Sequence, residues 1–260
     1  MNLVVLMRMV PDVVEELEIA SDQKSLDQEA LRLIVSESDD HALEEALLLK
    51  ERHGGAVTVV APEAPEAAEL LYTAAAKGAD RVIQLRGIQR GLGVAAMAEA
   101  CAAALSAIPG LLPADLVLTG TQSIEDLDGL VAPLVARRLG WPYLGVVTAV
   151  SDVSNGAVIV VKEFQAGYRG EFQVSLPAVL GVQAAEKPPR YVPVAKVRAA
   201  MKATKIEEFE APQPAPEPLQ ELAIVALAKP EAAGHAEMLE GSVEDVAGKL
   251  CELLAERGLL

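Results

Sequence analysis

The sequence predicts an α/β protein with a Rossmann-like, doubly wound and mostly parallel sheet, an antiparallel extension and a C-terminal helical arm. Three observations lead to this fold class. Short strand-like runs alternate with longer helical runs over the first 140 residues, as in right-handed βαβ units. The strand-like runs are continuously apolar, which is typical of parallel strands covered on both faces. A proline-rich segment then leads to an amphipathic helix.

The first half of the chain shows the alternation most clearly. LVVLM, residues 3–7, is expected to be a buried strand. A helix is expected over residues 39–53, where alanine and leucine recur at helical spacing until Gly54. The same reasoning predicts strands over 56–61, 81–85 and 114–120, and helices over 66–77, 93–108 and from about 128 to 139.

The pattern changes after Trp141. Strands are expected over 144–150, 156–164 and 171–182 with no long helix between them, as an antiparallel extension of the same sheet. We therefore expect a nucleotide-binding domain over residues 1–205, followed over 206–260 by an extended linker and a C-terminal helix. The helix begins at a capping box formed by Ser242 and Asp245. Its apolar face either folds back on its own domain or packs on a second subunit.

Composition limits the possible partners. A net charge of −16 and a pI near 4.6 exclude nucleic acid and anionic membranes as expected partners. No apolar run approaches the roughly 20 residues that span a bilayer, so we expect a cytoplasmic protein that does not span the membrane. Cys101 and Cys251 are expected to be buried free thiols.

The loop after Gly120 is the candidate binding segment. Thr121, Gln122 and Ser123 offer hydrogen bonds to a base, ribose or phosphate, and the following helix offers its first N–H groups to an anion. The three carboxylates of this loop would repel a polyphosphate, which favours a nucleotide with one phosphate and no metal. The alternative is that Asp126 or Asp128 simply caps the helix.

Other residues give little support for catalysis. His41, His53 and His235 have no neighbours at the spacing of a metal site or a catalytic triad. We therefore predict no catalytic residue and no metal. Six cations between Lys187 and Lys205 have no acid among them. This segment is either a solvated surface or a docking surface for an acidic partner or a flavin.

Several stretches, in order, resemble the β subunit of electron transfer flavoproteins. SESDDHALEEALLLKE, residues 36–51, resembles the family's N-P-F-D-E-x-A-L-E-E-A-x-R-L-K-E. TAAAKGADRVIQL, residues 73–85, resembles T-A-L-A-M-G-A-D-R-A-I-x-L. GTQSIEDLDGLVAPLVARRLGWP, residues 120–142, resembles G-K-Q-A-I-D-D-D-x-G-Q-V-G-P…L-G-W-P. LVVLMRMVPD at the start and LPAV followed by PRY complete the resemblance.

The resemblance implies a non-enzymatic electron carrier. Such a β subunit binds AMP, or a second FAD in the same pocket in bifurcating members, and pairs with an α subunit that holds the redox-active FAD. Electrons pass between dehydrogenases and a quinone reductase or other membrane-associated oxidoreductase. The pocket residues implied are Leu6, Ser36, Glu37, Ser38, Asp39, Ala61, Gly120, Thr121, Gln122, Ser123, Ile124, Asp126, Asp128, Gly129, Leu130 and Val131.

Departures from the family pattern lie in both expected contact regions. Ser36-Glu37-Ser38 replaces N-P-F, and Leu127 and Leu130 replace polar motif residues. AAEKP, residues 184–188, replaces the leucine anchor for acyl-CoA dehydrogenases, which implies a different redox partner. The chain ending resembles the bifurcating branch. Alternatives to the family are a stand-alone adenine-nucleotide sensor of the universal-stress type and an ATP-using enzyme, but the glycine-rich and pyrophosphate loops of those classes are missing.

Overall fold

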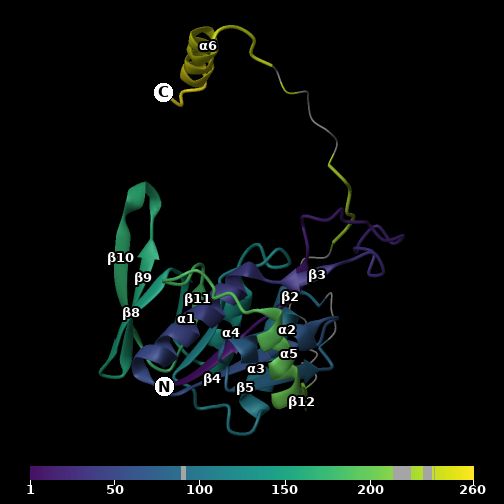
Figure 1. Cartoon of the computed structure of the whole chain (residues 1–260), viewed down its shortest axis with the longest axis vertical. Helices are drawn as coiled ribbons and strands as arrows, with labels where there is room; N and C mark the ends of the chain where they lie inside the picture. The colour runs from purple at the N-terminus through teal and green to yellow at the C-terminus, as the bar shows by residue number, and fades with distance from the viewer. Residues whose placement is uncertain (89–91, 213–223, 231–235, 237) are drawn as a thin grey trace. The chain divides into compact units, whose positions relative to one another are not determined.

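The computed structural model describes residues 1–88, 92–212, 224–230, 236 and 238–260. Residues 1–225 form one compact unit and residues 226–260 form a second. The first unit is built around a parallel sheet flanked by helices, as Figure 1 shows, and the predicted Rossmann-like fold is confirmed.

The central sheet has seven strands: β1 (Asn2–Leu6), β4 (Ala56–Pro62), β5 (Arg81–Arg86), β6 (Leu116–Gly120), β7 (Tyr143–Val147), β11 (Ala178–Val182) and β12 (Glu207–Glu210). Their order is β12-β5-β4-β1-β6-β11-β7, and each neighbouring pair is parallel. β11 is buried at every position, as expected of a parallel strand covered on both faces.

Helices cover both faces of this sheet: α1 (Glu37–His53), α2 (Ala67–Lys77), α3 (Val94–Ala107) and α4 (Val131–Leu139). Alternate residues of β1 point to opposite faces. Leu3 and Val5 pack with α1 and α2, whereas Val4 and Leu6 pack with α3 and α4. The side chains of both cores are mainly alanine, valine and leucine, because the chain has few aromatic residues.

The predicted antiparallel extension proves to be a separate sheet. It consists of β8 (Ala149–Ser154), β9 (Ala157–Glu163) and β10 (Arg169–Ser175), with the short 3₁₀ helix η1 (Gln165–Gly167) before β10. β7 precedes this small sheet in the chain and β11 follows it, and the two strands pair in parallel within the central sheet. Parallel neighbours need a crossover connection, and here an antiparallel sheet provides the crossover that a helix usually provides. Another antiparallel pair, β2 (Met9–Pro11) and β3 (Leu33–Val35), was not predicted.

The structure also shows order beyond residue 205. Helix α5 (Val194–Ala203) packs on α2, and β12 extends the central sheet next to β5. Arg81 pairs with Glu207 at 2.6 Å across these two strands. The sheet therefore continues to Glu210, a few residues into the segment that we expect to be an extended linker, because β12 pairs with β5. Residues 213–223 of the predicted linker, and His235, lie outside the described residues.

The second unit contains α6 (Val243–Glu256), and its predicted capping box is present: the Asp245 N–H donates to Ser242 Oγ at 3.2 Å.

The two cysteines differ in burial. Cys101 is buried as predicted, and burial raises the pKa of its thiol to about 12. The prediction for Cys251 was wrong: this thiol is exposed, since α6 has no buried residue. Among the described residues, no helix is long and apolar enough to cross a bilayer.

Candidate functional site

The candidate site lies where the order of the central strands reverses. From β1 the chain passes through α1 to β4 on one side, while β6 lies on the other side of β1. Ligands of open α/β sheets bind beyond the carboxyl ends of strands at such a reversal. The start of α1 and the loop after β6 meet there.

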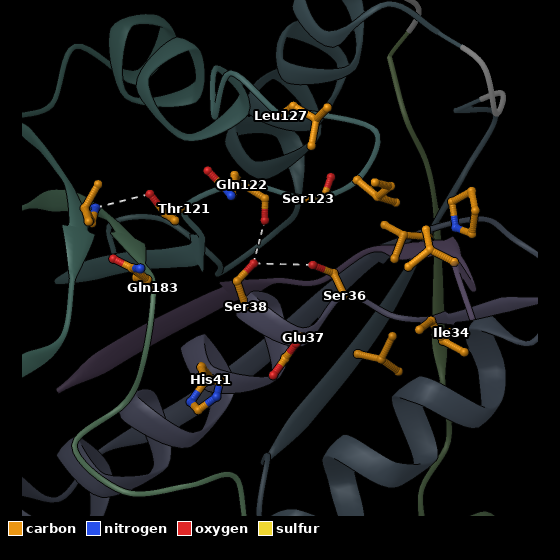
Figure 2. A pocket seen from close by; sticks show the side chains of 16 residues that line it. Ile34, Ser36, Glu37, Ser38, His41, Thr121, Gln122, Ser123, Leu127 and Gln183 are labelled. Atoms are coloured by element: carbon orange, nitrogen blue, oxygen red, sulfur yellow. Dashed lines mark hydrogen bonds between the residues drawn. The ribbon is translucent and has the colours of Figure 1, made fainter. Parts of the chain in front are cut away.

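A cavity of about 580 Å³ opens at this point, within the range of small-molecule sites. Figure 2 shows the side chains that line it, which are of two kinds; we call the apolar set the apolar wall and the polar set the polar wall. The apolar wall is lined by Val10, Pro11, Val13, Ile34, Val35, Ile124, Leu127 and Val146. The polar wall is lined by Ser36, Glu37, Ser38, His41, Thr121, Gln122, Ser123 and Gln183.

Gly120 allows α1 to approach the loop closely. A Cβ atom there would lie 2.2 Å from Ser38 Oγ and 2.5 Å from Asp39 Oδ1, far inside contact distance. Because Gly120 has no side chain, Ser38 can lie close to the loop, and its Oγ donates to the Gln122 carbonyl at 2.6 Å, a bond drawn in Figure 2. The first turn of α1 and the loop thus form one continuous polar wall.

Asp39 holds the end of β1 to the end of β6. Its side chain is fully buried, and it accepts the Gly120 N–H at 2.6 Å and the Arg8 N–H at 2.9 Å. The Arg8 guanidinium donates to both carboxylate oxygens at 3.0 Å. A buried carboxylate is stable only when paired and hydrogen-bonded in this way.

The contacts of Asp126 decide whether this residue caps α4 or leaves the first amides of the helix free. Its carboxylate accepts the Leu130 N–H at 2.8 Å and the Val131 N–H at 3.1 Å, and its Oδ2 lies 3.5 Å from an Arg8 nitrogen. Asp126 therefore caps α4. The helix begins at Val131 rather than near Asp128, because this carboxylate fixes the preceding turn. The amides of Leu130 and Val131 are thus engaged within the chain, as the capping alternative predicts.

Arg8 joins the two carboxylates in one buried network. Burial alone would lower the pKa of its guanidinium, but the charges of Asp39 and Asp126 outweigh that effect and raise the pKa. Arg8 interrupts an apolar run: LVVLM, residues 3–7, precedes it, and Met9 and Val10 follow it. A charged residue at such a position was the sequence signal that could have identified its role.

A strap over residues 183–190 crosses the flank of α1 and is fixed to it at three points. His41 Nδ1 accepts the Ala185 N–H at 3.1 Å, and Glu45 accepts the Glu186 N–H at 3.0 Å. Arg190 pairs with Glu44 at 2.8 Å. His41 also lines the cavity, so one side chain both holds the strap and forms part of the polar wall.

Val146 carries local strain at the cavity. Its φ is +59°, a value that β-branched residues rarely adopt. The Val146 N–H donates to Thr121 Oγ1 at 3.1 Å, as Figure 2 shows. Strained backbone of this kind persists where surrounding contacts determine it, often at functional sites. Neither Val146 nor Gln183 carried a sequence signal of its role.

Seven of the proposed pocket residues line the cavity: Ser36, Glu37, Ser38, Thr121, Gln122, Ser123 and Ile124. Nine do not line it. Leu6, Asp39, Ala61, Gly120, Asp126 and Val131 are buried around it, and Asp128, Gly129 and Leu130 form the turn before α4. Among the residues described, no group of three or more His, Cys, Asp or Glu side chains could hold a metal ion.

Comparison with known proteins gives a consistent picture. The family model for the electron transfer flavoprotein domain matches residues 25–214. The β subunit of the electron transfer flavoprotein of Clostridium acetobutylicum is 33% identical over 199 residues, which are 76% of this chain and 74% of the relative. The corresponding Mycobacterium bovis subunit is 31% identical over 207 residues, covering 77% and 76%.

One similarity extends over the full length of both chains. The subunit CarD of the caffeyl-CoA reductase–Etf complex of Acetobacterium woodii is 30% identical over 272 aligned positions, covering 100% of each chain. The similarity therefore includes the second unit as well as the Rossmann-like unit.

Proposed function

The chain belongs to the electron transfer flavoprotein family, and from this premise we propose that it is a β subunit that binds AMP and supports an FAD-carrying α subunit. The heterodimer would act in the cytoplasm. It would transfer electrons between a dehydrogenase and a quinone reductase or another acceptor.

The observation that supports AMP binding is the cavity at the carboxyl ends of β1 and β6. Its position is the one that open α/β sheets use for nucleotides. It combines an apolar wall suited to a flat base with hydroxyl and amide groups suited to a ribose and a base edge. The proposal takes this cavity as the AMP site and the sixteen residues predicted from the sequence as its walls and supports.

The role of carrier fits the chemistry of the lining. A subunit that holds a cofactor beside a partner needs packing and fixed dipoles rather than a nucleophile or a general base. His41, the histidine in the lining, accepts a backbone hydrogen bond through Nδ1 and so holds the strap. Its contact explains the residue without a catalytic role.

A second candidate is FAD in the same cavity, as in a bifurcating flavoprotein. The observation that favours it is the partly exposed apolar wall: Val13, Ile34, Ile124 and Leu127 are between 37% and 68% exposed and offer a surface for a further ring. FAD contains the AMP moiety, so both candidates use one adenylate site.

The test is to co-express the chain with an α subunit encoded beside it and to identify the nucleotides released from the purified complex. One FAD and one AMP per heterodimer would support the first candidate, and two FAD the second. A chain that purifies alone, without an adenine nucleotide, would contradict both.

The contribution of the C-terminal helix can be tested in the same complex. We propose that α6 packs on the α subunit, so deletion of residues 242–260 should weaken co-purification. The Ser242→Ala variant is the milder partner of this deletion, because it removes the cap and leaves the apolar residues. Unchanged co-purification after the deletion would contradict this role for α6.

A further inference from the structure

Two groups near this site that readily bind phosphate are already engaged within the protein: the Arg8 guanidinium and the amides at the start of α4. The Arg8 side chain is only 8% exposed and makes its contacts with Asp39 and Asp126. The two carboxylates already balance its charge. A phosphate that sought this cation would have to displace a buried carboxylate, which is costly.

The N-terminus of α4 is occupied in the same way. The amides of Leu130 and Val131 donate to the Asp126 carboxylate. Pro133 in the first turn of α4 has no N–H to offer. The dipole of this helix is therefore complemented by a residue of the chain, and a phosphate placed there would face the carboxylate.

The described residues that line the cavity include a carboxylate but no lysine or arginine. Glu37 contributes a carboxylate to the lining, whereas Ser36, Ser38 and Thr121 contribute hydroxyls. His41 accepts the Ala185 N–H through Nδ1, so this ring nitrogen is engaged within the chain. A dianionic phosphate would gain hydrogen bonds from these groups but would be repelled by Glu37.

The same lining suits an uncharged nucleoside. Gln122 and Gln183 each carry the donor and acceptor pair that matches the edge of adenine. The hydroxyls of the polar wall can bond a ribose, and the apolar wall can cover a base. Ile124 and Leu127 are 43% and 68% exposed, so a bound base would also remove apolar surface from water.

We propose that this cavity recognises its ligand through the adenosine moiety and gains little affinity from the phosphate. The inference rests on the proposed function, in which the cavity binds an adenine nucleotide. AMP and FAD share the recognised moiety, and they are separate arms of the experiment.

Calorimetric titration of the full-length chain, with its partner subunit where the two co-purify, tests the proposal after bound nucleotide is removed. Adenosine should bind within about tenfold of AMP, a difference of roughly 1.4 kcal/mol or less. FMN, which has a flavin ring and a phosphate but no adenosine, should bind more weakly than adenosine. FAD should compete with adenosine for the same site.

Variants of the lining separate charge from contact. Glu37→Gln should raise AMP affinity by about three- to tenfold, because it removes a like charge, and should leave adenosine affinity unchanged. Leu127→Lys, at an exposed position of the rim, should favour AMP over adenosine. Glu171→Gln on β10, an exposed glutamate outside the lining, is the matched control and should change neither affinity.

The outcomes separate the two proposals. AMP binding more than about tenfold tighter than adenosine would overturn the adenosine-based recognition and leave the proposed function standing. Binding of FMN as tight as that of adenosine would also overturn the recognition. If AMP, adenosine and FAD all fail to bind a chain that is folded by circular dichroism, the proposed nucleotide site itself is wrong.

Discussion

Two charged networks involve α1, and they differ in their exposure to water. The network of Arg8, Asp39 and Asp126 has side chains 8%, 0% and 4% exposed. The network of Arg190, Glu44 and Glu51 has side chains 30%, 4% and 56% exposed. The first joins the ends of β1, β6 and α4, whereas the second holds the strap to the flank of α1.

The difference teaches how burial sets the role of a charge. Removing one partner of a buried pair leaves an uncompensated charge, which is strongly destabilising. A pair that water reaches is weakened by solvent and by salt. We therefore expect the buried network to determine the shape of the cavity and the outer network to adjust the strap.

The largest effect is expected for Asp39→Ala. The substitution leaves the Arg8 charge with one carboxylate and removes the acceptor of the Gly120 N–H. Stability should fall by about 3–5 kcal/mol, measured by urea unfolding. Asp152→Ala on β8, at an exposed aspartate, is the control and should change stability by less than about 0.5 kcal/mol. Equal small losses would contradict the importance of the buried network.

A pair of glycines tests the turn that Asp126 organises. Gly129 and Gly140 have similar φ values of +65° and +70°, but a Cβ atom would lie 2.5 Å from the Thr121 carbonyl oxygen only at Gly129. Gly140→Ala should cost about 1 kcal/mol from the backbone alone. Gly129→Ala should cost about 2 kcal/mol more because of overlap. Equal losses in thermal unfolding would show that the turn relaxes freely.

Arg190→Ala tests the outer network. It removes the ion pairs to Glu44 and Glu51 and should cost about 1–2 kcal/mol at low ionic strength. Because these groups are partly exposed, the loss should shrink in roughly 1 M salt, where the Debye length is about 3 Å. The loss from Asp39→Ala should not shrink in this way. A salt-independent loss for Arg190→Ala would remove the distinction between the networks.

The smallest effect is a dependence on pH through Glu44. Burial opposes its charge, but its bonds to Arg190 outweigh burial and lower the pKa below the ordinary 4.5. The stability from Glu44 is therefore full above pH 4.5 and is lost as the pH falls through the lowered pKa. Unfolding curves of Glu44→Gln and the unchanged chain should differ near pH 7 and converge in acid.

Glu45 provides the opposite sign in the same helix. Burial raises the pKa of this carboxyl, so its contribution to stability decreases as the pH rises from its ordinary pKa of 4.5 toward the raised value. The stability of Glu45→Gln relative to the unchanged chain should therefore improve with rising pH over that interval. If the stabilities of Glu44→Gln and Glu45→Gln, each relative to the unchanged chain, changed with pH in the same direction, the opposite pKa shifts of the two carboxyls would be contradicted.

The alternation of apolar runs was enough to predict the central fold. β1, β4, β5 and β6 and the helices α1, α2 and α3 lie where periodicity placed them, and α4 begins about one turn later, because each buries a continuous apolar run or stripe. α5 and β12 were missed, since most of their residues are exposed and give weak periodicity, and their partners α2 and β5 lie about 120 residues earlier.

The candidate site was predictable only in part. The loop after Gly120 and the start of α1 could be identified from polar residues that follow apolar runs. The roles of Arg8, His41 and Gln183 could not, because they depend on contacts between segments 31 to 144 residues apart. Capping by Asp126 was one of two readings of the loop, and only the three-dimensional distances decide between them.

The single tryptophan has a practical consequence. Trp141 lies two residues after the end of α4, and its backbone N–H donates to the Ala136 carbonyl at 3.0 Å. Its side chain is half-buried and packs against the core formed by α3 and α4. Excitation at the long-wavelength edge of the protein's ultraviolet absorption therefore selects this one fluorophore, which lies at the end of α4 opposite to Asp126. The tryptophan emission is a label-free signal for that region. A bound flavin absorbs at the wavelengths of tryptophan emission, so it would reveal its presence by quenching that emission.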